Sequence, residues 1–214
     1  MLKTGVVLLA AGGATRMGVP KQLLEFKGQP LIRHVAETAL ASACRPVVIV
    51  LGSEAEAVSR VLLDLPVELV INPRWREGMG TSLHSGISAI AMHGVDGAIV
   101  ALGDQPLVTA ARFDALIAAH HATGKAIVAS AYSGTVGVPV LFTRALFPNL
   151  LALAPDAGCK GIILGNPDLT ASLDCPEAAD DIDTPADYQR VQSQLTTRGL
   201  APSAVAPDPT LTRP

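Results

Sequence analysis

Two cations, Arg16 and Lys21, lie in a glycine-rich loop that follows an apolar run at residues 6–10. Backbone N–H groups in such a loop can approach an anion closely, because glycine carries no side chain to shield them. A loop that offers amide donors and two positive side chains indicates a polyanionic ligand, most simply a nucleoside triphosphate. Without the two cations, a plain strand-to-helix turn would be the better explanation of the glycines.

This loop differs from two better-known phosphate loops. Gly13 and Gly18 have the glycine spacing of a Walker A loop, but Val19 and Pro20 follow where that loop requires Lys-Ser or Lys-Thr. The dinucleotide-binding fingerprint is also absent, because Gly12 and Gly13 are adjacent and no third glycine stands in register. The phosphate-binding prediction therefore rests on the two cations and on the rest of the chain.

Two aspartates supply the complementary chemistry. Asp104 follows the apolar run at residues 97–102, and Asp183 precedes a predicted helix that Thr184 caps. Mg²⁺ binds one or two carboxylates and completes its coordination with water and phosphate oxygens, so Asp104 and Asp183 are predicted to hold Mg²⁺, or Mn²⁺ in its place. Each also has a simpler interpretation, a turn residue for Asp104 and a helix N-terminal charge for Asp183. Their combination with the cationic loop favours the metal site.

Apolar runs alternate with amphipathic segments along most of the chain. This alternation predicts an α/β fold with a doubly wound, mostly parallel sheet, whose strands bind ligands at their carboxyl ends. The cationic loop, a loop at residues 74–80 and Asp104 would meet at that edge. The predicted strands are residues 6–10, 47–51, 67–71, 97–102 and 126–129, and the predicted helices are residues 30–43, 53–63, 81–91, 109–121 and 185–195.

The pattern is less regular after residue 130. Residues 137–142 could form a strand, but Pro139 argues against a central position because proline cannot donate to the hydrogen-bond ladder. A short helix at residues 157–164 and a short strand at residues 169–173 complete the pattern. Residues 1–195 are interpreted as a single domain, and residues 196–214, rich in Thr, Pro and Ala, as a disordered tail.

Composition argues against several classes of protein. The 214 residues carry a net charge of −3 without a basic block, which argues against nucleic acid as a partner. No uninterrupted apolar stretch is long enough to span a membrane, so no membrane association is expected. The cysteines at positions 44, 159 and 175 are odd in number and far apart. They offer neither a disulfide framework nor a metal site, which favours a reducing cytoplasm.

The stretch LAAGGATRMGVPKQLL, residues 9–24, resembles the signature L-A-A-G-x-x-x-R-M-G-x-x-K-x-L-L of nucleotidyltransferases of the molybdenum cofactor type, the MobA-like family. Three further stretches resemble the same family in the same order, at residues 72–82, 103–107 and 181–185. Together the four stretches span most of residues 5–195. The resemblance implies a Rossmann-like nucleotidyltransferase fold for this domain.

The resemblance also implies a role for individual residues. It implies that Arg16, Lys21 and Asp104 are catalytic and that Asp104 and Asp183 bind the metal. The nucleotide would be bound by the loop backbone and by residues near its base and ribose: Leu9, Ala10, Ala11, Gly12, Gly13, Arg16, Lys21, Gly80, Ser82 and Asp104. Two further residues stay open: Trp75 could cover a substrate ring or pack in its loop, and His84 is interpreted as a helix-surface residue.

By the same resemblance, the reaction is transfer of CMP from CTP to the terminal phosphate of molybdopterin, with release of pyrophosphate. The loop begins Leu-Ala-Ala-Gly, whereas guanylyltransferase relatives usually begin Leu-Ala-Gly-Gly, which favours CTP over GTP. The implied partners are CTP, molybdopterin and a molybdenum hydroxylase or its accessory chaperone. The alternatives are a guanylyltransferase of the same cofactor, a nucleotidyltransferase acting on a sugar or alcohol phosphate, and a non-catalytic module that delivers the cofactor.

Overall fold

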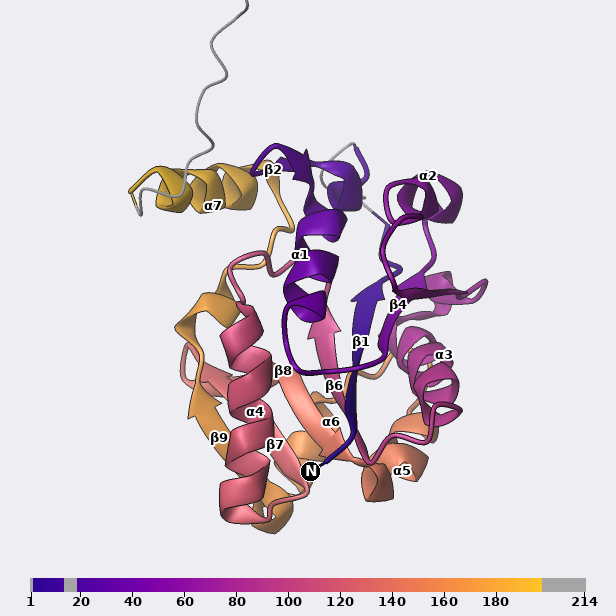
Figure 1. Cartoon of the computed structure of the whole chain (residues 1–214), viewed down its shortest axis with the longest axis vertical. Helices are drawn as coiled ribbons and strands as arrows, with labels where there is room; N and C mark the ends of the chain where they lie inside the picture. The colour runs from indigo at the N-terminus through magenta and orange to yellow at the C-terminus, as the bar shows by residue number, and fades with distance from the viewer. Residues whose placement is uncertain (1, 14–18, 198–214) are drawn as a thin grey trace, which may run out of the picture.

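The computed structural model describes residues 2–13 and 19–197. Its centre is a seven-stranded sheet in the order β5-β4-β1-β6-β8-β7-β9, and a two-stranded β2-β3 hairpin forms a second, small sheet (Figure 1). The strands are β1 (Thr4–Ala10), β2 (Glu25–Phe26), β3 (Gln29–Pro30), β4 (Val47–Leu51), β5 (Glu68–Ile71), β6 (Gly97–Leu102), β7 (Ile127–Tyr132), β8 (Thr135–Thr143) and β9 (Thr170–Asp174). The helices are α1 (Leu31–Leu40), α2 (Ala55–Arg60), α3 (Met79–Ala91), α4 (Ala110–Thr123), α5 (Phe147–Leu151), α6 (Lys160–Gly165) and α7 (Pro185–Thr197).

Strands β5, β4, β1 and β6 run parallel and form one half of the large sheet. β1 and β4 are aliphatic runs that are buried on both faces, as expected of parallel strands covered by helices. Val7 pairs with Val48 on one side and with Val100 on the other. The predicted doubly wound, mostly parallel sheet is confirmed.

The prediction that Pro139 does not take a central, fully hydrogen-bonded position is confirmed for the residue but is wrong about where its strand lies. β8 lies between β6 and β7 and is antiparallel to both. Its pairing with β6 ends at Val140, and its pairing with β7 shifts register between Ala129 and Ser130, so Pro139 has no ladder partner on either side. The Ser130 hydroxyl donates to the Pro139 carbonyl at 2.6 Å. A β-bulge thus accommodates the missing N–H group inside a central strand.

Helices cover both faces of the sheet, and alternating strand side chains divide between two hydrophobic cores. Val6 and Leu8 of β1 pack with residues of α1, α2 and α4, while Val7 and Leu9 pack with residues of α3, α5 and α6. In Figure 1, α1 and α4 lie in front of the sheet. The chain is therefore a three-layer α/β/α structure.

A third, smaller core lies at the end of the molecule where α7 lies beside β2 (Figure 1). It joins Phe26 of β2, Leu107 after β6 and Ile182 before α7, together with Val191 of that helix. Phe26 and Leu107 are far from each other and from the other two residues in sequence, and only Ile182 and Val191 belong to the same segment. The small core therefore fastens the carboxyl-terminal helix to the segments that follow β1 and β6.

The start of α7 follows the predicted capping pattern. The Thr184 N–H donates to Asp187 Oδ2 at 2.9 Å, and the Asp187 N–H donates to the Thr184 hydroxyl at 3.2 Å. This reciprocal pair is a capping box, with Pro185 as the first helical residue.

The predicted domain boundary at residue 195 is not tested by the fold. Residues 198–214, most of the predicted tail, lie outside the described residues, so the single domain at residues 1–195 stays a prediction. Within the described part of the chain, no helix combines the length and hydrophobicity needed to cross a membrane.

Candidate functional site

The site lies at the carboxyl ends of two central parallel strands, β1 and β6. β1 lies between β4 and β6, and the chain passes from β1 out to β4 and β5 before it returns to β6. Such a reversal opens a crevice at the carboxyl ends of the two strands. The Gly103 N–H donates to the Leu9 carbonyl at 3.0 Å, which holds together the segments that leave β1 and β6. Residues 10–13 and Asp104 emerge at this crevice.

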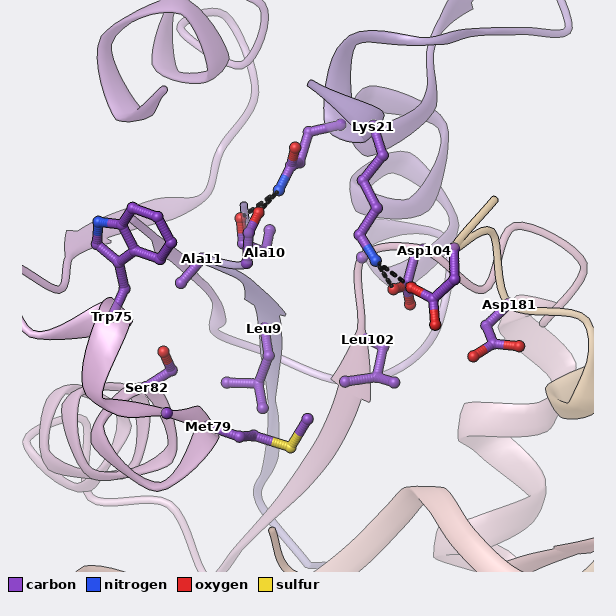
Figure 2. A pocket seen from close by; sticks show the side chains of 15 residues that line it. Leu9, Ala10, Ala11, Lys21, Trp75, Met79, Ser82, Leu102, Asp104 and Asp181 are labelled. Carbon is purple, nitrogen blue, oxygen red and sulfur yellow. Dashed lines mark hydrogen bonds and ion pairs between the residues drawn. The ribbon is translucent and has the colours of Figure 1, made fainter. Parts of the chain in front are cut away.

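Lys21 joins the two predicted metal ligands. Its ammonium nitrogen lies 2.6 Å from Asp104 Oδ2 and 2.8 Å from Asp183 Oδ1, and Figure 2 shows the side chain directed at Asp104. The three residues come from distant segments: a 3-10 helix at Lys21–Leu23, the loop after β6, and the segment before α7. The Ile182 N–H donates to the Asp104 carbonyl at 3.0 Å, which fixes the last segment beside the second.

Burial and neighbouring charges shift the pKa values of this group. Burial raises the pKa of the Asp104 carboxyl against the attraction of Lys21, and the carboxylates of Asp183 and Asp181 act in the same direction as burial. Burial, followed by Asp183, also raises the pKa of Asp181. Burial by itself would lower the pKa of Lys21, but Asp104 and Asp183 outweigh it and raise that pKa. Three carboxylates thus share one ammonium group, an excess of negative charge that a divalent cation would relieve.

One carboxylate oxygen is left for such a cation. Asp104 Oδ1 is buried and has no hydrogen-bond partner among the described residues. A buried, unpartnered carboxylate oxygen is costly, and a hard cation is the ligand that satisfies it. Asp104 and Asp183 therefore fit Mg²⁺ or Mn²⁺. In the described ranges, no three His, Cys, Asp or Glu side chains converge as a metal site.

Gln22 holds the start of the glycine-rich loop. Its buried side-chain amide donates to the carbonyls of Ala10, at 3.0 Å, and Gly12, at 2.7 Å. The C=O and N–H groups of a trans peptide point in opposite directions. Turning these carbonyls toward Gln22 therefore turns the N–H groups of Ala11 and Gly13 away from it, and no described residue accepts a hydrogen bond from either. Gln22 presets two amide donors for a ligand.

Ser82 lies in the first turn of α3, which begins at Met79 and not at the predicted residue 81. The buried Asn72, directly after β5, donates to the Ser82 hydroxyl oxygen at 3.0 Å and to the Thr81 hydroxyl oxygen at 2.9 Å. Because the Ser82 oxygen accepts from Asn72, its own proton is left to donate elsewhere. A carbonyl of a nucleotide base is one acceptor of the right kind.

Trp75 packs on the glycine-rich loop and also walls the cavity beside it. Its ring lies 3.1 Å from the position that a Cβ at Gly13 would occupy, and its own Cβ lies 2.6 Å from the corresponding position at Gly52. A side chain at Gly52 would collide with Trp75, and one at Gly13 would crowd its ring. The Arg76 guanidinium lies over the indole, 4.6 Å from the ring centroid. Trp75 therefore packs against neighbouring loops and also stands in the cavity wall, where it could cover a substrate ring.

These groups surround a cavity of about 360 Å³, which we call the nucleotide cavity. Lys21, Asp104 and Asp181 lie on one side of it, and Trp75 and Ser82 lie on the other (Figure 2). Eight of the residues predicted for the site line the cavity: Leu9, Ala10, Ala11, Gly12, Lys21, Ser82, Asp104 and Asp183. The structure thus brings together most of the predicted nucleotide-binding residues and both predicted metal ligands.

Other predicted residues do not line the cavity. Gly13 lies next to it against Trp75, and the Gly80 N–H is taken by the Pro155 carbonyl at 2.8 Å. Arg16 lies outside the described residues. His84 is exposed on α3, in agreement with its interpretation as a surface residue.

Sequence reasoning did not assign three residues that complete the site. Gln22 stands beside Lys21 and shows no pattern that distinguishes it from other loop glutamines. Asn72 and Asp181 belong to stretches that resemble the family, but no residue pattern there indicates that Asn72 bonds to Ser82 or that Asp181 lies near Asp104. The one signal in the sequence that could have identified these residues is that each is polar and lies within a stretch that resembles the family.

The comparisons with known proteins identify the family. The model of the MobA-like NTP transferase domain matches residues 6–169, so the chain belongs to the MobA-like NTP transferase family. It is a nucleotidyltransferase-type enzyme.

Two curated relatives match nearly the full length of the chain. Nicotine blue oxidoreductase of Paenarthrobacter nicotinovorans is 36% identical over 190 residues, which cover 83% of this chain and 91% of that protein. Purine catabolism protein PucB of Bacillus subtilis is 29% identical over 203 residues, which cover 89% and 96%. The names of these two relatives therefore point to different biochemical roles.

Solved structures show the same fold. Rv0371c from Mycobacterium tuberculosis, in a complex with manganese, has a TM-score of 0.69 and 27% identity, and the match covers 90% of this chain and 99% of that one. Molybdopterin-guanine dinucleotide biosynthesis protein A from Archaeoglobus fulgidus has a TM-score of 0.66 at 17% identity, with coverage of 90% and 99%, and this match shows the fold alone. A divalent metal therefore occurs in a structure of a relative.

Proposed function

We propose that the protein transfers CMP from CTP to the terminal phosphate of molybdopterin and releases pyrophosphate. One observation carries this proposal: Lys21 lies between Asp104 and Asp183, at the end of the glycine-rich loop and in a cavity at the reversal of the sheet. A cation and two carboxylates beside free amide donors fit a triphosphate and its metal ion. The product would pass to a molybdenum hydroxylase or its accessory chaperone in the cytoplasm.

The chain's own groups would act by position and charge. The N–H groups of Ala11 and Gly13, preset by Gln22, would bind phosphate oxygens, and Lys21 would neutralise negative charge on the triphosphate. Mg²⁺ or Mn²⁺, held by Asp104 and Asp183, would supply further charge neutralisation on the phosphates. Asp104 and Asp183 also hold Lys21 in place.

The reaction is a single displacement. An oxygen of the acceptor phosphate forms a bond to the α-phosphorus of CTP, the bond from that phosphorus to the bridging α–β oxygen breaks, and the electron pair leaves with pyrophosphate. No covalent enzyme intermediate is needed. The hydroxyl of Ser82 in the cavity wall is already an acceptor from Asn72, as expected of a binding group rather than of a nucleophile.

One feature of the base-binding side supports CTP over GTP. The Ala11 side chain is buried in the cavity wall, where a glycine would leave more room for a purine. The Ser82 proton is free to donate to an acceptor of either base, so it supports base binding without selecting between the two.

An oxidoreductase is the second candidate, because the Paenarthrobacter relative carries that name at 36% identity. The carboxylates of Asp104, Asp181 and Asp183 favour nucleotidyl transfer. Three carboxylates beside a phosphate-binding loop would repel a nucleotide unless a divalent cation bound with it, and hydride transfer has no need of that cation.

The test is release of pyrophosphate by the purified protein with molybdenum-loaded molybdopterin, in Mg²⁺ or Mn²⁺, with CTP, GTP, ATP and UTP in separate reactions. Release with CTP, abolished by a chelator, would support the proposal. Release with GTP would make the protein a guanylyltransferase, and release with a sugar or alcohol phosphate would identify another acceptor. Nucleotide binding without release from any of these would indicate a delivery module or an oxidoreductase.

A further inference from the structure

The ammonium group of Lys21 lies between the two carboxylates that are proposed to bind the metal ion. Its nitrogen is 2.6 Å from Asp104 Oδ2 and 2.8 Å from Asp183 Oδ1, and Figure 2 shows the side chain directed at Asp104. Mg²⁺ binds carboxylate oxygens at about 2.0–2.1 Å and tolerates little distortion of its octahedral shell. A lysine ammonium group and a divalent ion therefore compete for the same two side chains.

One carboxylate oxygen stays open while Lys21 is in place. Asp104 Oδ1 is buried and has no hydrogen-bond partner among the described residues. An ion that approached it would meet the positive charge that Lys21 holds on the other oxygen of the same carboxylate. Only 16% of the Lys21 side chain and 15% of the Asp104 side chain are exposed, so water and salt screen this repulsion poorly. Oδ1 by itself is therefore a weak site for a divalent ion until the ammonium group moves.

Lys21 can move its charge without moving its backbone. Gln22, the next residue of the same 3-10 helix, bonds to the carbonyls of Ala10 and Gly12 and so anchors the main chain. The lysine side chain itself has a flexible four-carbon stem. Among the described residues that line the nucleotide cavity, Lys21 is the one cation, and Ala11 of the glycine-rich loop lines the same cavity. The ammonium group can therefore pass from the aspartates to phosphates bound at that loop.

We propose that Lys21 is a placeholder cation, which keeps a divalent ion off Asp104 and Asp183 until the phosphates of a nucleotide draw the ammonium group away. The inference rests on the proposed function, which supplies CTP as that nucleotide. The triphosphate then acts twice, because it gives Lys21 a new anionic partner and gives the metal ion further oxygen ligands. Metal and nucleotide bind cooperatively, and the enzyme without nucleotide holds little metal.

A different role for Lys21 makes the opposite prediction. Asp104, Asp181 and Asp183 line the same cavity, and a simple clamp would hold these carboxylates together against their mutual repulsion. Removing a clamp would let the carboxylates separate, and the metal site would weaken. Removing a placeholder instead leaves the carboxylates without the charge that competed for them, so the metal site would strengthen. The affinity for a metal ion in the absence of nucleotide distinguishes the two roles.

Direct binding of Mn²⁺, measured from the electron paramagnetic resonance signal of the free ion, makes this distinction. Lys21→Met removes the charge and keeps an unbranched side chain. Lys27→Met is the matched control, because it removes the same charge from the β2-β3 turn, where the Lys27 nitrogen lies 5.5 Å from the centroid of the Phe26 ring and outside the cavity lining. Without nucleotide, we expect Lys21→Met to bind Mn²⁺ about ten-fold more tightly than the unmodified protein, and Lys27→Met to change the affinity by less than about two-fold. An affinity that Lys21→Met leaves unchanged or weakens would overturn the proposal.

A second measurement uses the unmodified protein and so does not depend on the folding of a variant. Acetic anhydride labels free amines, and mass spectrometry gives the extent of labelling at each lysine. Mn²⁺ at concentrations that fill the site should raise the labelling of Lys21 about five-fold, because the ammonium group loses both carboxylate partners, and should leave Lys27 unchanged. Labelling of Lys21 that saturating Mn²⁺ does not change would contradict displacement of the ammonium group.

The role of the nucleotide is tested by repeating the Mn²⁺ titration with CTP and no acceptor, after correction for the Mn²⁺ that free CTP binds. CTP should strengthen Mn²⁺ binding about ten-fold more in the unmodified protein than in Lys21→Met, where no ammonium group has to be displaced. Equal strengthening in both proteins would refute the coupling. None of these measurements needs transfer, so a protein that fails to transfer CMP can still confirm the placeholder. One that transfers CMP, with the same Mn²⁺ affinity in Lys21→Met, refutes the placeholder alone.

Discussion

The nucleotide cavity and a smaller cavity beside it, which we call the side chamber, share the wall residues Leu9, Met79 and Leu102, but they are built in different ways. The nucleotide cavity is made by loops that leave the ends of parallel strands, and its charged groups are Lys21, Asp104 and Asp183. The side chamber is made largely by the faces of β6 and β8, and most of its side chains are aliphatic. The charged groups thus come from loops, and the apolar walls come from strand faces.

This difference has a physical reason. Loops at strand ends expose backbone N–H groups and carry glycine, Lys and Asp, which bind phosphate and metal. Strand faces present branched side chains at fixed spacing, so they form an apolar wall that offers a ligand few hydrogen bonds. Changes in the two regions should therefore affect different kinetic constants.

The largest expected effect is on the charged side. Asp104→Asn should lower kcat by on the order of a hundredfold or more, because it removes a buried charge that would bind the proposed metal ion and that holds Lys21. Asp183→Asn should cost less, since 47% of the Asp183 side chain is exposed against 15% for Asp104. Pyrophosphate release at saturating CTP and acceptor measures both. The comparison fails if the two variants lose equal activity, or if Asp104→Asn changes the acceptor KM alone.

A control for folding is available in the same protein. Trp75 is the single tryptophan and lines the nucleotide cavity, so its emission reports CTP binding directly. An Asp104→Asn protein that binds CTP in the absence of metal as the unmodified protein does, yet turns over slowly, has lost chemistry and not structure.

The next effect should come from Gln22. Gln22→Ala would release the carbonyls of Ala10 and Gly12 and with them the orientation of two amide donors, so the KM for CTP should rise about ten-fold. Gln22→Glu should be worse, because a carboxylate would face those carbonyls. Gln29→Ala is the control, since its side chain bonds to Glu37 away from both cavities. An unchanged CTP affinity in Gln22→Ala would show that the loop keeps its conformation without that side chain.

The smallest effect should come from the α7 cap. Hydrogen bonds from Thr184, and then from Arg190, lower the pKa of Asp187 to about 2. A carboxyl whose pKa is lower in the folded protein stabilises the fold above its unfolded pKa of ~3.9, and this stability is lost as the pH falls through about 2.

Asp187→Asn should therefore cost about 1 kcal/mol of unfolding free energy at pH 7, and less between pH 4 and 3. Urea unfolding across this range measures the difference between the two proteins. A difference that grows as the pH falls would contradict this assignment. Neither the CTP nor the acceptor KM should move by more than about two-fold, because Thr184 and Asp187 line neither cavity.

The parallel half of the molecule could be predicted from sequence because short, continuous segments of the chain indicate its strands and loops. Continuous aliphatic runs such as VVIVL in β4 are typical of strands covered on both faces, and the glycine-rich loop follows the first of them. Lys21 stands in the loop after the first run, Asp104 follows the run of β6, and Asp183 precedes a helix cap. Topology alone then brings them to one edge.

The antiparallel half could not be predicted in the same way. Pro139 indicates an edge position by its chemistry, and only the register shift opposite Ser130, a property of another strand, allows it inside the sheet. The contacts of Gln22 with residues 10 and 12, and of Asn72 with Ser82, depend on how loops turn and not on residue type. The side chamber depends on the pairing of β6 with β8, which no short pattern reveals.

The small third core has a consequence for how the protein opens and closes. Ile182 is fully buried there, directly between Asp181 and Asp183, while Phe26 and Leu107 follow Lys21 and Asp104 within a few residues. Any transient detachment of α7 would carry Asp183 away, so an opened molecule would bind metal and nucleotide poorly. By linkage, CTP with Mg²⁺ should slow hydrogen exchange in α7 and in the β2-β3 hairpin, although those amides do not line the nucleotide cavity. Hydrogen exchange in α7 would then report whether the nucleotide cavity is occupied, although no residue of α7 lines that cavity.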